Sequence, residues 1–167
     1  DVPVTEQDFI DLTVAFATMD PDGDNVHNTT GMSITDSWMF LSQVWAGFGF
    51  TDERWMWAED GESVVIPSLE DTSLPALSFF RRMNKAGGLD PDFATYGSSG
   101  ARTAFCSGKL GMLSTQNDPG TMNGIRTEWN SFEDNPPFLE AIEILNPPLH
   151  PGKQYVGFML QPYWSET

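Results

Sequence analysis

Residues 77–95 read LSFFRRMNKAGGLDPDFAT, a helical pattern that ends in a pair of glycines and passes into a proline-containing loop. The apolar spacing predicts a helix over about Ser73 to Ala86, with Pro75 in its first turn and Gly87 in a left-handed C-terminal position. We expect this helix to bury one apolar stripe against the rest of the domain. The residues of that stripe are Leu74, Leu77, Phe80 and Met83.

Helices and short strands alternate on both sides of this segment. Helices are predicted over 5–18, 35–47, 99–107 and 119–129, and strands over 31–34, 110–115, 141–145 and 154–160. An Asp-Gly turn at 59–61 predicts a hairpin between the runs 54–57 and 62–66. This alternation favours an α/β layer structure, and 167 residues without an internal repeat suit a single domain.

Two of these elements carry specific expectations about their side chains. The first helix has an approximate capping box, formed by Thr5 and Asp8. Its apolar face is predicted to consist of Phe9, Leu12, Phe16 and Met19. In the hairpin, Trp55 and Trp57 alternate with Met56 and therefore share one face, which we expect to pack on the core.

The charge of the chain limits the partners that it can bind. There are 24 acidic and 8 basic residues, a net charge of −16, which repels phosphate backbones and anionic membranes and argues strongly against nucleic-acid binding. Two histidines and one cysteine are too few for a zinc site, whereas the carboxylates favour cations that prefer oxygen ligands. The 6 Trp and 12 Phe indicate either an aromatic core or a surface on which a ligand stacks.

An acidic, turn-rich loop, Asp20-Pro21-Asp22-Gly23-Asp24, follows the first helix. Its aspartates stand at the first, third and fifth positions of an EF-hand-like loop, in which tight coiling turns alternate carboxylates toward one centre. The backbone carbonyl of Val26 falls at the seventh position and the side chain of Asn28 at the ninth. The predicted ligands of a calcium ion are therefore Asp20, Asp22, Asp24, Val26 and Asn28.

Two positions of this loop depart from an EF-hand. Asn25 replaces the glycine of the sixth position, although Asn tolerates the left-handed backbone better than most residues. Gly31 stands at the twelfth position, where a bidentate Glu is required, so a true EF-hand is excluded. Two interpretations stay open: a calcium site completed by Thr29 or a distant carboxylate, and a solvated Asx-turn loop without a cation.

Three stretches, taken in order, are similar to the bacterial extracellular solute-binding proteins that serve sugar-type ABC importers. They are the acidic loop followed by Thr30-Gly31, the segment 76–95 with its Gly-Gly-Leu-Asp-Pro-Asp-Phe run, and Phe105-Cys106-Ser107-Gly108-Lys109-Leu110-Gly111-Met112. Their order and spacing over about Phe9 to Met112 are more specific than any one of them. The last third, with Pro147-Pro148 and Pro151-Gly152-Lys153, resembles the family more loosely.

The resemblance implies an α/β fold that is one lobe of a type II periplasmic-binding-protein-like fold, with several helices packed on a small mixed sheet. Such proteins have two lobes joined by a hinge, so residues 1–167 are expected to form a single domain that is one excised lobe. The family further implies a structural calcium ion in the acidic loop, a monomer, and an ABC permease as the partner of the full-length protein. The expected location is extracellular, lipid-anchored at the outer face of the cytoplasmic membrane, or periplasmic.

Loops at strand ends and at helix N-termini are where a cleft of this fold binds its ligand. The candidate ligand-binding residues are Trp38, Gln116, Asn117, Asp118, Tyr163 and Trp164. Several of them have a purely structural alternative. Trp38 fits a core position, Asn117 and Asp118 precede Pro119 as a helix cap would, and Trp164 fits a packing contact near the end of the chain.

The function that follows is non-enzymatic capture of a solute, held in a cleft between two lobes, with a carbohydrate or oligosaccharide favoured by the aromatic content. No Gly-x-Ser-x-Gly motif, phosphate-binding glycine loop or zinc signature supports an enzyme, and Cys106 is interpreted as a small buried residue. The alternative is a calcium-stabilised surface module, either a fragment of a carbohydrate-active enzyme or an adhesion module. Release of reducing sugar from glycans would favour that enzyme.

Overall fold

A computed structural model of the chain describes residues 5–21, 25–33, 44–49, 55–58, 60–115, 118–145, 148 and 150–152. The strand predicted over 154–160 and most of the helix predicted over 35–47 lie outside these residues. Of that helix, the described part is a helical turn at 44–47.

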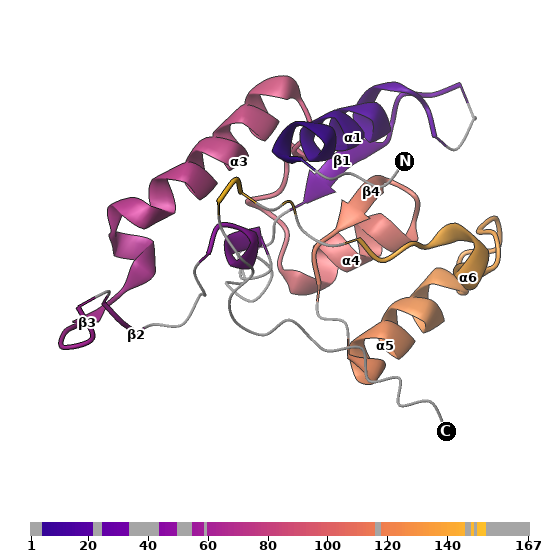
Figure 1. Cartoon of the computed structure of the whole chain (residues 1–167). Helices are drawn as coiled ribbons and strands as arrows, with labels where there is room; N and C mark the ends of the chain where they lie inside the picture. Colours follow the sequence, from indigo (N-terminus) through magenta and orange to yellow (C-terminus); the bar gives the residue numbers. More distant parts are fainter. Residues whose placement is uncertain are drawn as a thin grey trace.

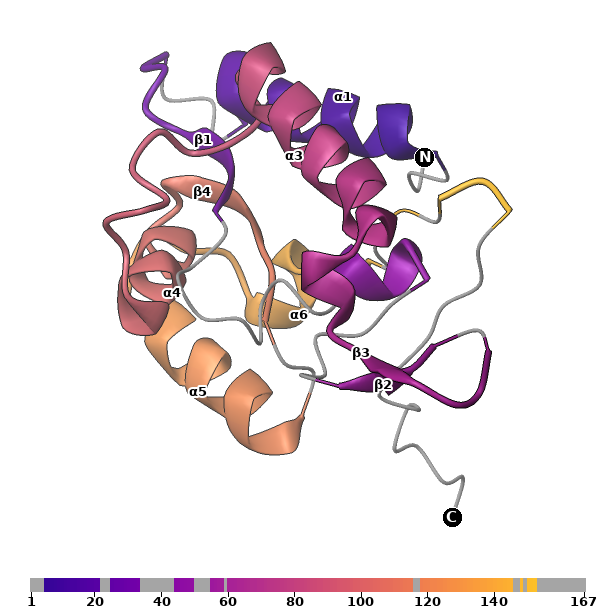
Figure 2. The same cartoon turned by 90° about the vertical axis from the view of Figure 1, so that its left-hand side faces the viewer.

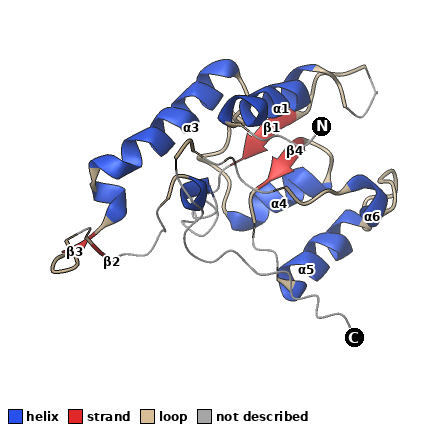
Figure 3. Cartoon of the chain, in the orientation of Figure 1, coloured by secondary structure: helices blue, strands red, loops and turns tan. Residues whose placement is uncertain are grey.

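A short parallel sheet lies at the centre of the described fold. Strand β1 (Thr30–Ser33) pairs in parallel with β4 (Leu110–Leu113), and Met32 of β1 stands opposite Met112. On its other side, Met32 forms a parallel bridge with Leu89. Helix α1 (Glu6–Thr18) and helix α4 (Ser98–Cys106) lie on opposite sides of these strands (Figure 1). The predicted alternation of helix and strand is thus confirmed, although the strands are short (Figure 3).

Helix α1 begins as its sequence predicts and then turns a different face to the core. Thr5 and Asp8 form the reciprocal capping box, with Asp8 N donating to Thr5 Oγ1 at 3.1 Å. The buried residues are Phe9, Ile10 and Thr13. Met19, predicted to lie inward, is 74% exposed. The prediction is wrong there because α1 packs on both the sheet and a second helix, which rotates its buried side toward Ile10 and Thr13.

That second helix is α3 (Leu74–Ala86), which follows the two 3-10 turns η1 (Pro67–Leu69) and η2 (Asp71–Ser73). It ends at Gly87 with φ +83°, the left-handed position that the sequence predicts. The side chains that it buries are Ala76, Phe79 and Met83.

Two of the residues predicted to face inward from α3 are exposed instead. Leu74 and Leu77 point away from the core, so the predicted stripe is displaced by part of a turn. The contact with α1 explains the shift, because the Phe79 ring lies 6.0 Å from that of Phe9 and 5.6 Å from that of Phe48. Met83 is buried as predicted, and Phe80 is partly buried against the same cluster.

The second half of the described chain builds a smaller apolar cluster. Helix α5 (Pro119–Trp129) matches its predicted range, and α6 (Phe138–Ala141) is a single helical turn. The Trp129 ring meets the rings of Phe105 and Phe138 at 5.9 and 6.3 Å. Cys106 and Ile125 complete the buried part of the cluster.

The strand predicted over 141–145 is wrong. Ala141 ends α6, and residues 142–145 have no regular secondary structure. Ile142 packs on the cluster around Trp129, whereas Ile144 is exposed. A segment with alternating apolar side chains forms a strand only where a neighbouring strand pairs with its backbone. Residues 142–145 follow α6 directly and lie at the edge of a helical cluster instead.

The predicted hairpin is confirmed in a shorter form. Strand β2 (Met56–Trp57) pairs antiparallel with β3 (Val64–Val65), and Trp57 stands opposite Val64. The hairpin lies beyond the N-terminal end of α3, away from the sheet of β1 and β4 (Figures 1 and 2).

Candidate functional site

The acidic loop that follows α1 closes on itself through its first aspartate. Asp20 Oδ2 accepts a hydrogen bond from the backbone N of Asn25 at 2.9 Å. Both residues have a left-handed backbone, with φ +51° at Asp20 and +65° at Asn25. The sequence-based argument that Asn25 tolerates this conformation is therefore confirmed.

The described half of the loop offers oxygen atoms of the kind that calcium prefers. They are a carboxylate at Asp20, a backbone carbonyl at Val26, which accepts from Asn28 N at 2.9 Å, and an exposed amide side chain at Asn28. The predicted ligands Asp22 and Asp24 lie outside the described residues. Within the part of the chain that the structure describes, no group of three or more His, Cys, Asp or Glu side chains is placed to hold a metal. The donor chemistry fits calcium, and the ion stays a prediction.

A buried aspartate connects the start of β1 to the Gly-Gly-Leu-Asp-Pro-Asp-Phe run. Asp90 is 2% exposed, and its Oδ2 accepts from Thr30 Oγ1 at 3.1 Å. Its Oδ1 accepts from the backbone N of Asp92 at 2.9 Å. Burial, together with the Asp90 carboxylate, raises the pKa of Tyr96. The sequence shows Asp90 only as an Asp before Pro, and nothing in it indicates that the Asp90 side chain is buried.

Asp118 is the candidate ligand-binding residue that the structure describes, and it caps α5. Its Oδ1 accepts from the backbone N atoms of Gly120 and Thr121, at 2.9 and 3.1 Å, and its Oδ2 accepts from Thr121 Oγ1 at 2.5 Å. Hydrogen bonds to Thr121 lower the pKa of Asp118. The structural alternative is therefore confirmed for Asp118. Contact with a ligand stays a prediction.

The other candidate ligand-binding residues lie outside the described residues, namely Trp38, Gln116, Asn117, Tyr163 and Trp164. The grouping of these residues with Asp118 therefore stays a prediction. Trp45, from the helical turn at 44–47, is partly buried and packs on the main core.

Two tryptophans whose spacing predicts packing on the core are exposed. Trp55 is 63% exposed and Trp57 is 68% exposed. Their predicted packing on the core is wrong, because the hairpin that carries them lies beyond the end of α3 rather than against the sheet (Figure 2).

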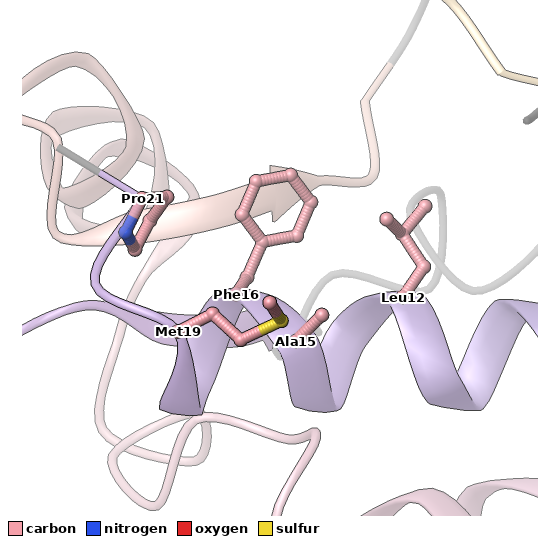
Figure 4. Close-up of a pocket in the computed structure, with 5 residues that line it drawn as sticks. All are labelled: Leu12, Ala15, Phe16, Met19 and Pro21. Carbon is pink, nitrogen blue, oxygen red and sulfur yellow. The ribbon is translucent and has the colours of Figure 1, made fainter. Parts of the chain in front are cut away.

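A small apolar pocket lies beside α1, on the side from which Phe16 reaches Gly111 of β4. Its volume is about 130 Å³, and it is lined by Leu12, Ala15, Phe16, Met19 and Pro21 (Figure 4). Ligand pockets usually span about 300–1,000 Å³ and carry a few polar groups. Because all five lining side chains are apolar, this pocket offers no side-chain hydrogen bond to a sugar hydroxyl.

Cys106 and its surroundings do not form a nucleophilic site. The thiol is fully buried, and its Sγ lies 3.7 Å from the carbonyl oxygen of Ile125, to which it donates. Burial raises the pKa of Cys106 to about 11, so the protonated form persists at neutral pH. The prediction that Cys106 is a small buried residue is confirmed.

The chain is similar to one curated protein and to several solved structures. No family model matches the chain. The chain is 30% identical over 122 residues to Lipoprotein LipO of Bacillus subtilis, a match that covers 68% of this chain and 23% of the lipoprotein. The substrate-binding protein FusA of the S. pneumoniae ABC transporter, solved in complex with kestose, superposes with a TM-score of 0.57 at 21% identity. That match covers 66% of this chain and 23% of FusA.

Two further structures have the same fold. One is an EF-hand mutant of FusA in complex with fructo-nystose, with a TM-score of 0.54 at 22% identity and coverage of 66% and 23%. The other is an HMO-binding, ABC-transporter-associated solute-binding protein from Bifidobacterium longum infantis, with a TM-score of 0.53 at 20% identity and coverage of 68% and 25%. Over its matched part, the chain is thus similar in sequence to a lipoprotein and shares its fold with substrate-binding proteins of ABC transporters.

The expected α/β fold of the periplasmic-binding-protein type is thereby confirmed. The chain spans about a quarter of the length of the relatives that it matches. Among the residues described, none of the helices combines the length and apolarity needed to cross a membrane.

Proposed function

We propose that this chain is one lobe of a longer solute-binding protein that captures an oligosaccharide for an ABC importer. The observation that carries the proposal is the joint match, over about two thirds of the chain, to a curated lipoprotein and to solved binding proteins that hold sugars. The strongly acidic composition agrees with a neutral ligand, because a net charge of −16 repels anionic solutes.

The mechanism is non-covalent in this proposal. The two lobes of the longer protein close about a hinge around the sugar, and the closed form docks on the permease. Trp38, Gln116, Asn117, Tyr163 and Trp164 remain proposed contacts of the cleft. Asp118 acts mainly in holding the N-terminus of α5, since both of its oxygens already accept hydrogen bonds. A carboxylate has roughly four acceptor positions. The bonds from Gly120 and Thr121 occupy most of those of Asp118, so little hydrogen-bonding capacity is left for a ligand.

A structural calcium ion in the acidic loop is part of the same proposal. Asp20, Asp22, Asp24, Val26 and Asn28 would hold it, and the ion would tie the end of α1 to the start of β1. Support comes from the donor chemistry of the described half and from FusA, for which an EF-hand is named. In this chain Asn25 and Gly31 depart from an EF-hand, so a partly open coordination shell is proposed.

The proposed location is the outer face of the cytoplasmic membrane, with the longer protein held there by a lipid. The support is the lipoprotein relative and the ABC-transporter setting of the solved neighbours. An acidic domain of this kind is repelled by anionic lipid head groups, so membrane attachment by the domain surface itself is unfavourable.

A thermal-shift screen of the longer protein against neutral oligosaccharides tests the proposal. A captured sugar at about 100 times its dissociation constant should stabilise the protein by about 2.7 kcal/mol. Each sugar is then recovered and analysed by chromatography. Stabilisation with intact sugar supports capture. New reducing ends would support the carbohydrate-active enzyme instead, and an unchanged melting temperature with every sugar would contradict the proposal.

A further inference from the structure

The β2–β3 hairpin exposes an unusual amount of aromatic surface. Trp55 immediately precedes β2 and Trp57 ends it, so the alternation of an extended chain directs both indoles to one side. Their Cα atoms are separated by about 7 Å in such a chain. Val64, opposite Trp57 on β3, lies on the same side and is also exposed. We call Trp55, Trp57 and Val64 the hairpin platform.

The turn of this hairpin is held by its own aspartate. Asp60 Oδ1 accepts from the backbone N atoms of Glu62 and Ser63, at 2.9 and 3.0 Å, and Ser63 Oγ donates to Asp60 Oδ2 at 2.9 Å. Ala58 N donates to Ser63 O at 2.9 Å and closes the two strands. A two-stranded hairpin is marginal by itself, so these bonds hold the platform in one geometry before any ligand arrives.

The chemistry around the platform selects among possible ligands. Indole rings offer flat apolar faces with a polar N–H at the edge, which suits the mixed apolar and hydroxyl surface of a sugar ring. The exposed carboxylates of Asp60 and Glu62 accept hydrogen bonds and carry negative charge, as does the chain as a whole. Anionic ligands are therefore disfavoured, and neutral hydroxyl-bearing rings fit best.

We propose that the hairpin platform is a stacking site for neutral oligosaccharides, in which Trp55 and Trp57 each lie against a sugar ring. The inference rests on the proposed function and adds to it a named contact surface outside the predicted cleft residues. Large exposed apolar side chains gathered on one face are the mark of a binding surface rather than of ordinary surface composition. Glu62, two residues before Val64 in the same hairpin, is exposed, so its carboxylate is open to accept from sugar hydroxyls.

The experiment titrates the longer protein, labelled with ¹⁵N, with kestose, nystose and maltoheptaose, and with sialyllactose as an anionic comparison. We expect the indole N–H signals of Trp55 and Trp57 to shift with the neutral sugars and to shift less with sialyllactose. Calorimetry on Trp55→Ala and Trp57→Ala should show affinity for maltoheptaose reduced about tenfold. Trp57→Phe should retain most of the affinity because it keeps a ring.

Two controls separate stacking from general damage. Leu139→Ala removes an apolar side chain that is 87% exposed on α6, and it should leave the affinity unchanged. Melting temperatures of the tryptophan variants should match the parent, since neither indole is part of the buried core.

The outcomes also separate this inference from the proposed function. If the parent protein binds no sugar, the proposed function fails and the inference fails with it. If the parent binds sugars and both alanine variants bind them equally well, the platform is overturned while the proposed function stands. Tryptophan signals that respond only to a protein partner would likewise overturn the platform.

Discussion

At the scale of single residues, Glu128 on α5 shows how one carboxylate joins two helices. Its Oε1 accepts from Thr103 Oγ1 at 2.6 Å and its Oε2 accepts from Arg102 Nε at 2.6 Å, both from α4. The hydrogen bond from Thr103, followed by that from Arg102 and its charge, lowers the pKa of Glu128. The ionised form is therefore the one that the folded state stabilises.

Replacing Glu128 by Gln should cost about 1 kcal/mol at neutral pH, because the pair is only partly buried. A lowered folded-state pKa gives stability that is complete above the ordinary carboxyl pKa of about 4.3 and is lost as the pH falls through the folded value. Urea unfolding at pH 7 and pH 3 measures the difference. The exposed Glu133→Gln is the charge-matched control. A deficit in Glu128→Gln as large at pH 3 as at pH 7 would refute the assignment.

Cys106 supplies a second prediction at this scale. Because the thiol is buried and its pKa is raised to about 11, it should not react with a thiol reagent such as dithionitrobenzoate in the folded protein at pH 8. One thiol per chain should appear when urea is added, since the sequence has a single cysteine. Rapid reaction under native conditions would show that the cluster around Trp129 is open.

At the scale of elements, the sequence predicted helix ends better than helix faces. Capping residues act locally, so Thr5, Gly87 and Asp118 could be assigned without knowledge of the fold. The face that a helix buries depends on its neighbours, which is why Leu77 and Met19 were assigned inward and are exposed. The hairpin could be predicted because its Asp-Gly turn is a local feature. The surroundings of its two tryptophans could not, because they depend on how the hairpin lies relative to distant elements.

The contact between α1 and the sheet gives a prediction for Gly31. A Cβ atom at Gly31 would collide with the backbone oxygens of Gly88 and Thr13, which cannot swing aside as a side chain can. Gly31→Ala should therefore destabilise the fold by about 1–3 kcal/mol, measured by urea unfolding. Gly124→Ala on α5 is the matched control, since a Cβ there meets only the end of the Arg102 side chain, at an ordinary contact distance of 3.7 Å. Equal stability of the two variants would show that α1 does not lie as close to β1 as described.

The acidic loop gives the prediction that tests calcium. Calcium at about 100 times its dissociation constant should raise the free energy of unfolding by about 2.7 kcal/mol relative to excess chelator. Magnesium should give less, because it demands a stricter octahedral shell. Asp24→Asn should reduce the calcium-dependent part and leave the melting temperature in chelator nearly unchanged. A parent protein that melts identically in calcium and in chelator has no such site.

At the scale of the whole molecule, the order of three motifs was enough to predict the fold type and the similarity to lipoprotein relatives, because local motifs can persist at 30% identity. The ligand-binding residues could not be predicted from such motifs. A cleft between two lobes takes its shape from both, and this chain spans about a quarter of its relatives. The features that the structure does describe are the buried Asp90, the capped α5 and the exposed hairpin.

The decisive measurement for sugar capture is a calorimetric titration of the longer protein with a neutral oligosaccharide, followed by chromatography of the recovered sugar. A protein that captures sugar without cleaving it should give a saturable heat at one sugar per protein, with the sugar recovered unchanged. The absence of saturable binding with any neutral oligosaccharide, or recovery of the sugar as cleaved products, would contradict that function.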